Sequence, residues 1–376
     1  MKNLIEEHLL HKIELNKKIL FSEFMELSLY HPDYGYYTSK SNIFGDKGDF
    51  ITSPITSSIF GECISNEFIN IAKSQNISSI LELGGGDGSL AISVFNYLKK
   101  NKSLPDKYII LEISENLINH QQERIKKEFP DNYSTFEWVT SLEGIKINGL
   151  IIANEFFDAL PTERFRVKNS KLETLYIESN NQSFNYVWDE SSDLFLVELS
   201  RAKNKHNINF PDGYISELNL NNSKWINMID KCMESGVLFI IDYGYPAREY
   251  FLHDRTDGTL VCIHQHKSNF DPLVYIGNQD ISSFVNFSHL KNISLNTSLN
   301  VSGFLPQSAF LINLNILDIY QSKDYSNKDE SLIESNKLKN ILLPNTMGEL
   351  FKVLIMQKNI DIELKSNKEF NQMYKL

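Results

Sequence analysis

The sequence predicts an α/β fold in which a mostly parallel sheet carries helices on both faces. Short apolar runs alternate with helical patterns between residues 59 and 160. The run at 150–153 is apolar throughout, which is typical of a central strand buried on both faces. The run at 80–83 leads directly into a glycine-rich turn and a helix. Because alternating strands and helices form parallel sheets, we expect one large α/β domain with additions.

Length and composition narrow the class of protein. A chain of 376 residues fits one large domain with insertions, or two domains. The net charge of -11 argues against nonspecific nucleic-acid binding, which needs a basic surface. The three cysteines are far apart and form no C-x-x-C pair, so neither a disulfide framework nor a zinc site is indicated. Without a signal-peptide pattern or a long apolar run, we expect a cytoplasmic protein.

The turn at 84–88 has the character of a ligand-binding loop. Glu82, Gly84, Gly86 and Gly88 form an E-x-G-x-G-x-G pattern at the end of the strand. Glycines allow backbone angles that a Cβ forbids, and they let a ligand come close to the chain. The helix that follows directs free N–H groups into the space above the loop. An ordinary strand–helix turn is the plain alternative.

A second carboxylate favours a nucleoside site. The next apolar run, at 108–111, ends in Glu112, at the spacing where an acidic residue meets a ribose hydroxyl. No G-x-x-x-x-G-K-[ST] pattern occurs, so a phosphate-loop enzyme is disfavoured. A nicotinamide oxidoreductase normally has its loop at the chain start, whereas about seventy residues precede this one. S-adenosylmethionine methyltransferases tolerate such additions, and we favour that class.

Acidic and amide side chains follow two further strands. Asn154 and Glu155 come directly after the apolar run, Asp158 lies close by, and Asp242 ends the run at 237–242. Ligands of parallel sheets bind at the carboxyl ends of the strands, so these residues and the glycine loop are expected to face one crevice. Two alternatives stay open: Asp158 as a helix cap, and Asp242 as a structural acid that bonds the turn after it. Glu82 is expected to hold the glycine loop more than to touch the ligand.

The remaining segments predict an extension and insertions. Residues 2–30 have helical patterns, and 44–54 form a loop rich in glycine, acid and hydroxyl groups that is either a connector or a ligand-facing segment. Residues 163–218 alternate like antiparallel strands, which indicates a β-rich insertion, and 243–290 form a loop-rich excursion. We expect a strand near 292–298, a helix from about 305, a polar linker at 321–337 and a last strand at 351–356.

Several of these segments together resemble the MidA-like methyltransferases, a family that includes the arginine methyltransferase of mitochondrial complex I assembly. The resemblance covers nearly the whole chain and rests on residues 30–37, 44–54, 153–161, 242–244, 258–260, 271–273, 285–287 and 347–353. It implies a class I methyltransferase fold (Rossmann-like), with a seven-stranded sheet whose last strand is antiparallel. Two departures are Gly85, where the family often has proline, and Ile55, where it usually has glutamate.

The resemblance also implies a function. S-adenosyl-L-methionine would be the cofactor, and the acceptor would be an arginine on the large core subunit of NADH:quinone oxidoreductase. Carboxylates suit a guanidinium acceptor because they bind its fork of N–H groups and leave no charge unpaired. A non-catalytic assembly chaperone that keeps the cofactor site is the alternative from another class. The expected catalytic residues are Asn154, Glu155, Asp158 and Asp242, and the expected cofactor residues are Glu82, Gly84, Gly86, Gly88, Glu112, Gly48, Asp49, Thr52 and Ser53.

Two expectations complete the sequence-based account. His264 and His266 alternate on an expected strand beside Asp271, but exposed strand histidines are the simpler interpretation and methyl transfer needs no metal. Residues 1–75 are expected to form a helical extension with a loop that covers the cofactor. Residues 76–376 would form the methyltransferase domain, with insertions at about 163–218 and 243–290.

Overall fold

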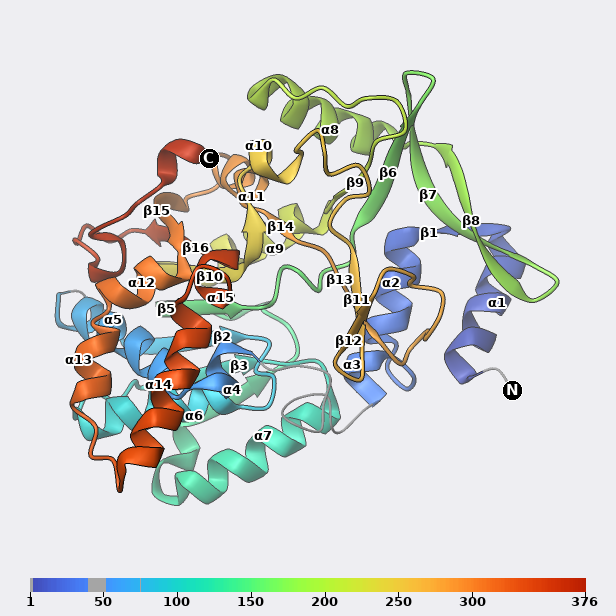
Figure 1. The fold of residues 1–376 in the computed structure, drawn as a ribbon. Helices are drawn as coiled ribbons and strands as arrows, with labels where there is room; N and C mark the ends of the chain where they lie inside the picture. The colour runs from blue at the N-terminus through green and yellow to red at the C-terminus, as the bar shows by residue number, and fades with distance from the viewer. Residues whose placement is uncertain (1–2, 40–51, 75) are drawn as a thin grey trace.

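The computed structural model describes residues 3–39, 52–74 and 76–376. Its centre is a mixed sheet in the spatial order β15-β16-β10-β5-β2-β3-β4, with the two-residue strand β14 (Val285–Asn286) paired to β10 (Figure 1). The strands are β2 (Ser79–Leu83), β3 (Lys107–Leu111), β4 (Phe136–Val139), β5 (Ile147–Asn154), β10 (Met233–Tyr245), β15 (Asn300–Pro306) and β16 (Phe351–Lys358).

Strand directions confirm the predicted class. The β2–β5, β2–β3, β3–β4 and β5–β10 pairs are parallel, whereas β16 is antiparallel to both β10 and β15. The last strand of the chain is therefore inserted antiparallel between two others, as expected of a class I methyltransferase sheet. The sheet has eight strands, seven in the main order and β14 paired to β10.

Helices cover both faces of this sheet. Alternate β5 side chains enter two different cores, with Leu150 and Ile152 in one and Ile151 and Ala153 in the other. This alternation explains why the sequence run is apolar throughout. The first core is closed by α5 (Ile59–Ser74), α6 (Ser89–Lys100), α7 (Glu115–Glu128), α12 (Gln307–Asn313), α13 (Ile316–Gln321) and α14 (Lys328–Leu342), and the second by α9 (Asn221–Cys232) and α11 (Phe287–Ser294).

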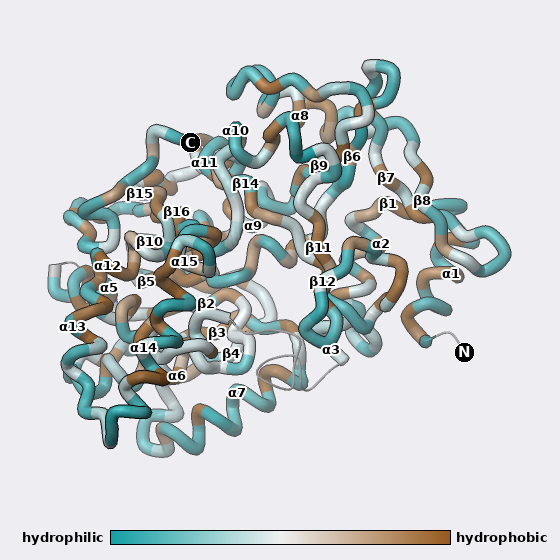
Figure 2. Tube along the Cα trace, in the orientation of Figure 1, coloured by the Kyte–Doolittle hydropathy of each residue, from teal (hydrophilic) through white to brown (hydrophobic). Residues whose placement is uncertain are grey.

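A second, antiparallel sheet confirms the β-rich insertion. It contains β6 (Glu163–Lys168), β7 (Lys171–Asn180), β8 (Ser183–Glu190) and β9 (Ile215–Leu218), and α8 (Asp193–His206) packs on it. The tube view shows the β7–β8 hairpin extending beside the N-terminal helices (Figure 2). The predicted N-terminal helices are α1 (Leu4–Asn16) and α2 (Phe21–Tyr30), and the short strand β1 (Lys18–Leu20) between them pairs with β7.

The excursion after β10 forms a small sheet near the N-terminal helices. It comprises β11 (Val261–His264), β12 (Lys267–Asn269) and β13 (Asp280–Ser282), preceded by α10 (Ala247–Tyr250). Short helices α3 (Tyr36–Ser39), α4 (Ser53–Thr56) and α15 (Met347–Leu350) and the 3-10 turns η1 (Pro130–Thr135), η2 (Lys365–Asn367) and η3 (Met373–Lys375) complete the fold. Among the residues described, no helix is long and apolar enough to span a bilayer.

Two sequence-based predictions were wrong. The strand expected near 292–298 is instead the end of α11, up to Ser294, followed by a turn, and β15 begins only at Asn300. Asn286 caps α11, and Phe287, Leu290 and Ile293 bury one helical face. The linker expected at 321–337 contains most of α14. That helix is polar along most of its length, and only Leu338 and Ile341 are buried in its final turn, so its sequence has a weak apolar stripe.

Candidate active site

A cavity of about 590 Å³ opens at the carboxyl ends of β2, β3 and β5. Its wall is built from the glycine loop, the ends of these strands, α2, α9, β11 and the start of β16. This volume lies within the range of small-molecule sites, and the position is the one expected of parallel α/β sheets. Of the residues predicted as functional, the wall includes Glu82, Gly84, Gly86, Glu112, Thr52, Asn154, Glu155 and Asp158.

The glycine loop requires glycine at several positions. Gly84, Gly86 and Gly88 have φ angles of 74°, 53° and 82°, a region that favours glycine. Gly88 is the N-cap of α6 and is absent from the cavity wall, so its contribution is to the turn. A Cβ on Gly85 would lie 2.6 Å from Cγ2 of Ile110, which explains why this chain has no larger residue there.

Glu112 is held at the edge of the cavity. Its Oε1 accepts hydrogen bonds from the backbone N–H groups of Ile113 at 2.9 Å and Ser114 at 3.0 Å. Burial raises the pKa of the carboxyl group, and these N–H donors oppose that shift. Gln121 contacts Oε2 at 3.4 Å and also donates to the carbonyl of Gly86, so one side chain joins the acid to the glycine loop.

Glu82 lies in β2, directly before the glycine loop. Tyr108 donates a hydrogen bond of 2.7 Å to its Oε2, and the carboxyl group is 2% exposed. Burial raises its pKa to about 8. A mainly neutral acid at neutral pH fits the expected role in holding the loop, while its place in the wall also gives it contact with the cavity.

The end of β5 combines strained backbone with acidic side chains. Glu155 has φ 50°, which is uncommon for a residue with a Cβ and is a feature of functional sites. The Nδ2 group of Asn154 donates a hydrogen bond of 3.2 Å to Glu155 Oε1. The Oδ1 atom of Asn154 is buried and has no hydrogen-bond partner. Asp158 is 6% exposed, and its Oδ1 also has no partner. Unsatisfied buried acceptors beside a cavity indicate a site for a donor ligand.

The acids at this end of the sheet are poorly solvated. Burial, reinforced by repulsion from Asp158, raises the pKa of Glu155 to about 8. Burial raises the pKa of Asp158 to about 6, although the phenol of Tyr243 donates a hydrogen bond to its Oδ2. A cationic ligand that enters the cavity would lower both pKa values and stabilise the ionised pair.

Asp242 accepts hydrogen bonds from backbone N–H groups and does not line the cavity. Its Oδ2 accepts from the N–H groups of Phe157 at 3.0 Å and Asp158 at 3.2 Å, and Oδ1 accepts from Tyr243 at 3.0 Å. The side chain is fully buried, and burial raises its pKa. These contacts favour the alternative that Asp242 is a structural acid. It holds the backbone of the turn that contains Asp158.

The loop at 44–54 is described only from Thr52 onward. Gly48 and Asp49 lie outside the described residues. Thr52, Pro54 and Ile55 line the cavity. The Ser53 hydroxyl points elsewhere, toward Gln307 Oε1 at 3.2 Å. The start of α4 therefore forms part of the cavity wall.

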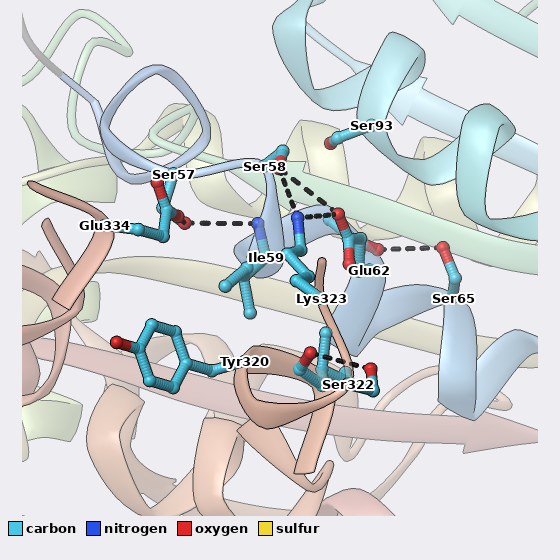
Figure 3. A network of polar contacts seen from close by, with 12 residues as sticks. Ser57, Ser58, Ile59, Glu62, Ser65, Ser93, Tyr320, Ser322, Lys323 and Glu334 are labelled. Carbon is cyan, nitrogen blue, oxygen red and sulfur yellow. Dashed lines mark hydrogen bonds and ion pairs between the residues drawn. The ribbon is translucent and has the colours of Figure 1, made fainter. Parts of the chain in front are cut away.

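A polar network anchors α4 to the C-terminal helices (Figure 3). Ser57, directly after α4, donates to Glu334 of α14 and accepts from the N–H of Ile59 at 3.2 Å. Lys323 bonds to Glu62 of α5 at 2.6 Å and to Ser58 at 3.1 Å. The segment that enters the cavity is thus held between α5 and α14.

Ser57→Ala is expected to lower the free energy of unfolding by about 1–2 kcal/mol, because it removes a buried donor and leaves Glu334 without it. The exposed neighbour gives a matched control, since Ser58→Ala is expected to cost less than about 0.5 kcal/mol. Urea titration of both variants measures the difference. Equal losses would show that the contact between α4 and α14 contributes nothing specific.

His264 is held by contacts with the loop between β12 and β13. His264 stacks on Tyr275 with ring centroids 4.2 Å apart, and its Nδ1 lies 2.7 Å from the carbonyl oxygen of Asn278. Within residues 3–39, 52–74 and 76–376, no group of three or more His, Cys, Asp and Glu side chains is arranged to hold a metal.

Sequence reasoning missed several aromatic residues of the wall. Tyr30, Tyr37, Trp225 and Tyr243 line the cavity but come from α2, α3, α9 and β10. The tyrosines lie in segments that carried the family resemblance, and this was the available signal. Their convergence on Asp158 depends on contacts between residues far apart in the chain.

The site fits S-adenosylmethionine. The loop of positive-φ glycines, the carboxylate at the end of β3 and the cavity between them are the features that bind a nucleoside in such sheets. The sheet order, with one antiparallel strand inserted near the edge, is that of class I methyltransferases. Fold and site together define an S-adenosylmethionine-dependent methyltransferase.

Comparison with known proteins gives the family. The family model described as "Putative S-adenosyl-L-methionine-dependent methyltransferase" matches residues 60–305, and the chain belongs to this family. A crystal structure from Burkholderia thailandensis with S-adenosyl-homocysteine bound superposes with a TM-score of 0.93 at 26% identity, covering 99% of this chain and 96% of the other. The family match and this bound ligand agree with S-adenosylmethionine, the predicted cofactor.

Curated relatives include mitochondrial proteins. The protein arginine methyltransferase NDUFAF7 of Homo sapiens is 26% identical, covering 92% of this chain and 81% of the relative. The protein from Danio rerio with the same name is 28% identical, covering 93% and 85%. The Drosophila melanogaster homologue is 27% identical, covering 80% and 72%.

Proposed function

We propose that this methyltransferase transfers the methyl group to an arginine side chain of a protein. The observation that carries the proposal is the pair of acids, Glu155 and Asp158, that faces the cofactor cavity from the end of β5. The names of the curated relatives, which are protein arginine methyltransferases, support the same acceptor.

The charge of the cavity wall supports a cationic acceptor. Among the described residues the wall contains the acids Glu26, Glu82, Asp87, Glu112, Glu155 and Asp158, and the single base Lys224. Asp87 is paired with Arg124 and the buried Glu82 is mainly neutral, so the acids left to pair with a cationic acceptor are Glu26, Glu112, Glu155 and Asp158. An acidic mouth attracts a basic segment and repels a phosphate backbone.

The acid pair suits both tasks that an arginine acceptor imposes. A guanidinium stays protonated in water, so it must be oriented and must lose a proton as the new N–C bond forms. Glu155 and the unpartnered Oδ1 of Asp158 supply acceptors for its N–H groups. Bound S-adenosylmethionine would supply the methyl group, and the chain would position the nitrogen beside it in the cavity.

The proposed target is the large core subunit of NADH:quinone oxidoreductase. Its support is the sequence resemblance, together with relatives named as mitochondrial arginine methyltransferases. The test is mass spectrometry of this subunit from cells with and without the gene. We expect one arginine to lose its methyl groups in the deletion, and re-expression of the wild-type protein to restore them.

Identical arginine methylation in both strains would refute the target and favour the assembly-chaperone alternative. Re-expression of Glu155→Gln separates the two functions. If the variant restores assembly of the oxidoreductase without methylation, then binding and not methyl transfer is the essential activity.

A further inference from the structure

Lys224 is the only base among the charged side chains of the cavity wall, within the part of the chain that the structure describes. The residue lines the cavity and is also exposed, so it lies where the cavity meets solvent. Its ammonium group forms no ion pair or hydrogen bond with another described residue. A cation without a partner therefore stands at the mouth of an otherwise acidic cavity.

Hydrogen bonds join the start of α9, which carries Lys224, to the segment that follows β5. The Nδ2 group of Asn219 donates to the carbonyl oxygen of Leu160 at 3.0 Å. The Nδ2 group of Asn221 donates to the carbonyl oxygen of Pro161 at 2.8 Å. Lys224 thus belongs to the side of the cavity that contains the proposed acceptor acids.

A pair of aromatic rings supports the same placement. Trp225 packs edge-to-face on Phe156 with ring centroids 4.8 Å apart, and both rings line the cavity. Phe156 directly follows Glu155, whereas Glu112 follows β3, which is separated from β5 by β2. Lys224 therefore lies beside the proposed acceptor site and away from the carboxylate expected to bind the ribose.

The stability of α9 does not explain a lysine at this position. Lys224 is the fourth residue of the helix, near the positive end of the helix dipole, where a cation is unfavourable. Lys231 lies in the last turn, where a cation is favourable. The cavity, and not the helix, gives the charge of Lys224 a use.

We propose that Lys224 pairs with an acidic side chain that lies close to the acceptor arginine in the substrate protein. The inference rests on the proposed function, in which the wall acids bind the guanidinium. Those acids would attract any basic segment, whereas Lys224 repels a second basic residue and attracts a carboxylate. The substrate class is thus an arginine with an aspartate or glutamate nearby, and Lys224 determines specificity without touching the reacting atoms.

The test uses short peptides with one central arginine and, at each position around it in turn, glutamate, glutamine or lysine. At the position that faces Lys224, the kcat/KM of the wild type should be about tenfold higher with glutamate than with lysine, and intermediate with glutamine. The difference should lie in KM, and it should shrink at high salt because the pair is exposed. Lys224→Glu should reverse the order of the three peptides.

Lys231→Glu is the matched control, because Lys231 is an exposed lysine of the same helix that does not line the cavity. This variant should keep the wild-type order of peptides. Calorimetry of the peptides with protein saturated with S-adenosylhomocysteine gives a readout without turnover, and the affinities should follow the same order and the same reversal.

An unchanged order in Lys224→Glu, or an equal loss with all peptides, would overturn the inference while arginine methylation by the wild type still stands. Weaker binding of S-adenosylhomocysteine to Lys224→Glu would also overturn it, since Lys224 would then hold the carboxylate of the cofactor. A wild type that methylates no arginine in any peptide would refute the proposed function and this inference with it.

Discussion

Glu155→Gln is expected to lower the rate of arginine methylation by at least about 100-fold and to leave the affinity for S-adenosylhomocysteine unchanged. The substitution keeps the size of the side chain and its bond to Asn154, but it removes the charge that pairs with the guanidinium. Removing one preorganised electrostatic contact typically lowers the rate of an enzyme by about this factor. Single-turnover assays and calorimetry measure the two quantities separately.

Glu163→Gln is the control for this substitution. Glu163 is also a buried acid with a pKa raised by burial, but it bonds to Ser22 beneath the second sheet and does not line the cavity. The rate of arginine methylation by Glu163→Gln should stay within about threefold of the wild-type rate. A Glu155→Gln protein that is folded, binds the cofactor product and methylates normally would exclude a guanidinium clamp at this position.

The pH dependence of acceptor binding follows from the raised pKa of Glu155. Below about pH 8 the free carboxyl group is mainly protonated, so binding of a cation must first displace that proton. The KM for an arginine peptide is therefore expected to fall as pH rises from 6.5 to 8.5. This dependence should be much weaker in Glu155→Gln, which has no proton to lose.

Glu112→Ala is expected to weaken binding of S-adenosylhomocysteine by about 1–3 kcal/mol, or about 5- to 150-fold, because it removes charge-assisted bonds to the ribose. The thermal stabilisation that the ligand gives to the wild type should shrink accordingly. Glu115→Ala, three residues further on and exposed at the start of α7, should bind like the wild type. Equal affinity in a folded Glu112→Ala protein would show that this carboxylate does not hold the ribose.

The part of the cavity wall that we expect to hold the cofactor could be predicted because its signals are local. Gly84, Gly86 and Gly88 are required by the backbone of one turn, and Glu112 lies at the end of the next strand in the same sheet. Sequence spacing and the rule that ligands bind at strand ends are sufficient for such a site.

The proposed acceptor half of the cavity could be predicted only in part. Asn154 and Glu155 follow a strand that was easy to recognise, but the positive φ of Glu155 leaves no mark in the sequence. Tyr243 meets Asp158, 85 residues earlier in the chain, and Tyr37 donates to Asp280, 243 residues later. No periodicity reports contacts of that range, so these roles required the folded chain.

Asp242 and α14 show two further limits of prediction from sequence. An acid at a strand end has the same sequence signal whether it faces a ligand or, like Asp242, bonds to the backbone of a neighbouring turn. A helix with few buried positions, such as α14, resembles a polar linker because only Leu338 and Ile341 mark its apolar side. Tertiary packing decides both cases.

Methyl transfer by the purified protein is the most direct test of the central claim. The protein is incubated with S-adenosylmethionine carrying a deuterated methyl group and a set of peptides matched except for one residue, which is arginine, lysine, glutamine or histidine. Fragmentation mass spectrometry then locates the label. We expect labelled methylarginine in the wild type and none in Glu155→Gln. Label on any other residue, or no label from a protein that binds S-adenosylhomocysteine, would contradict the assignment of arginine as the acceptor.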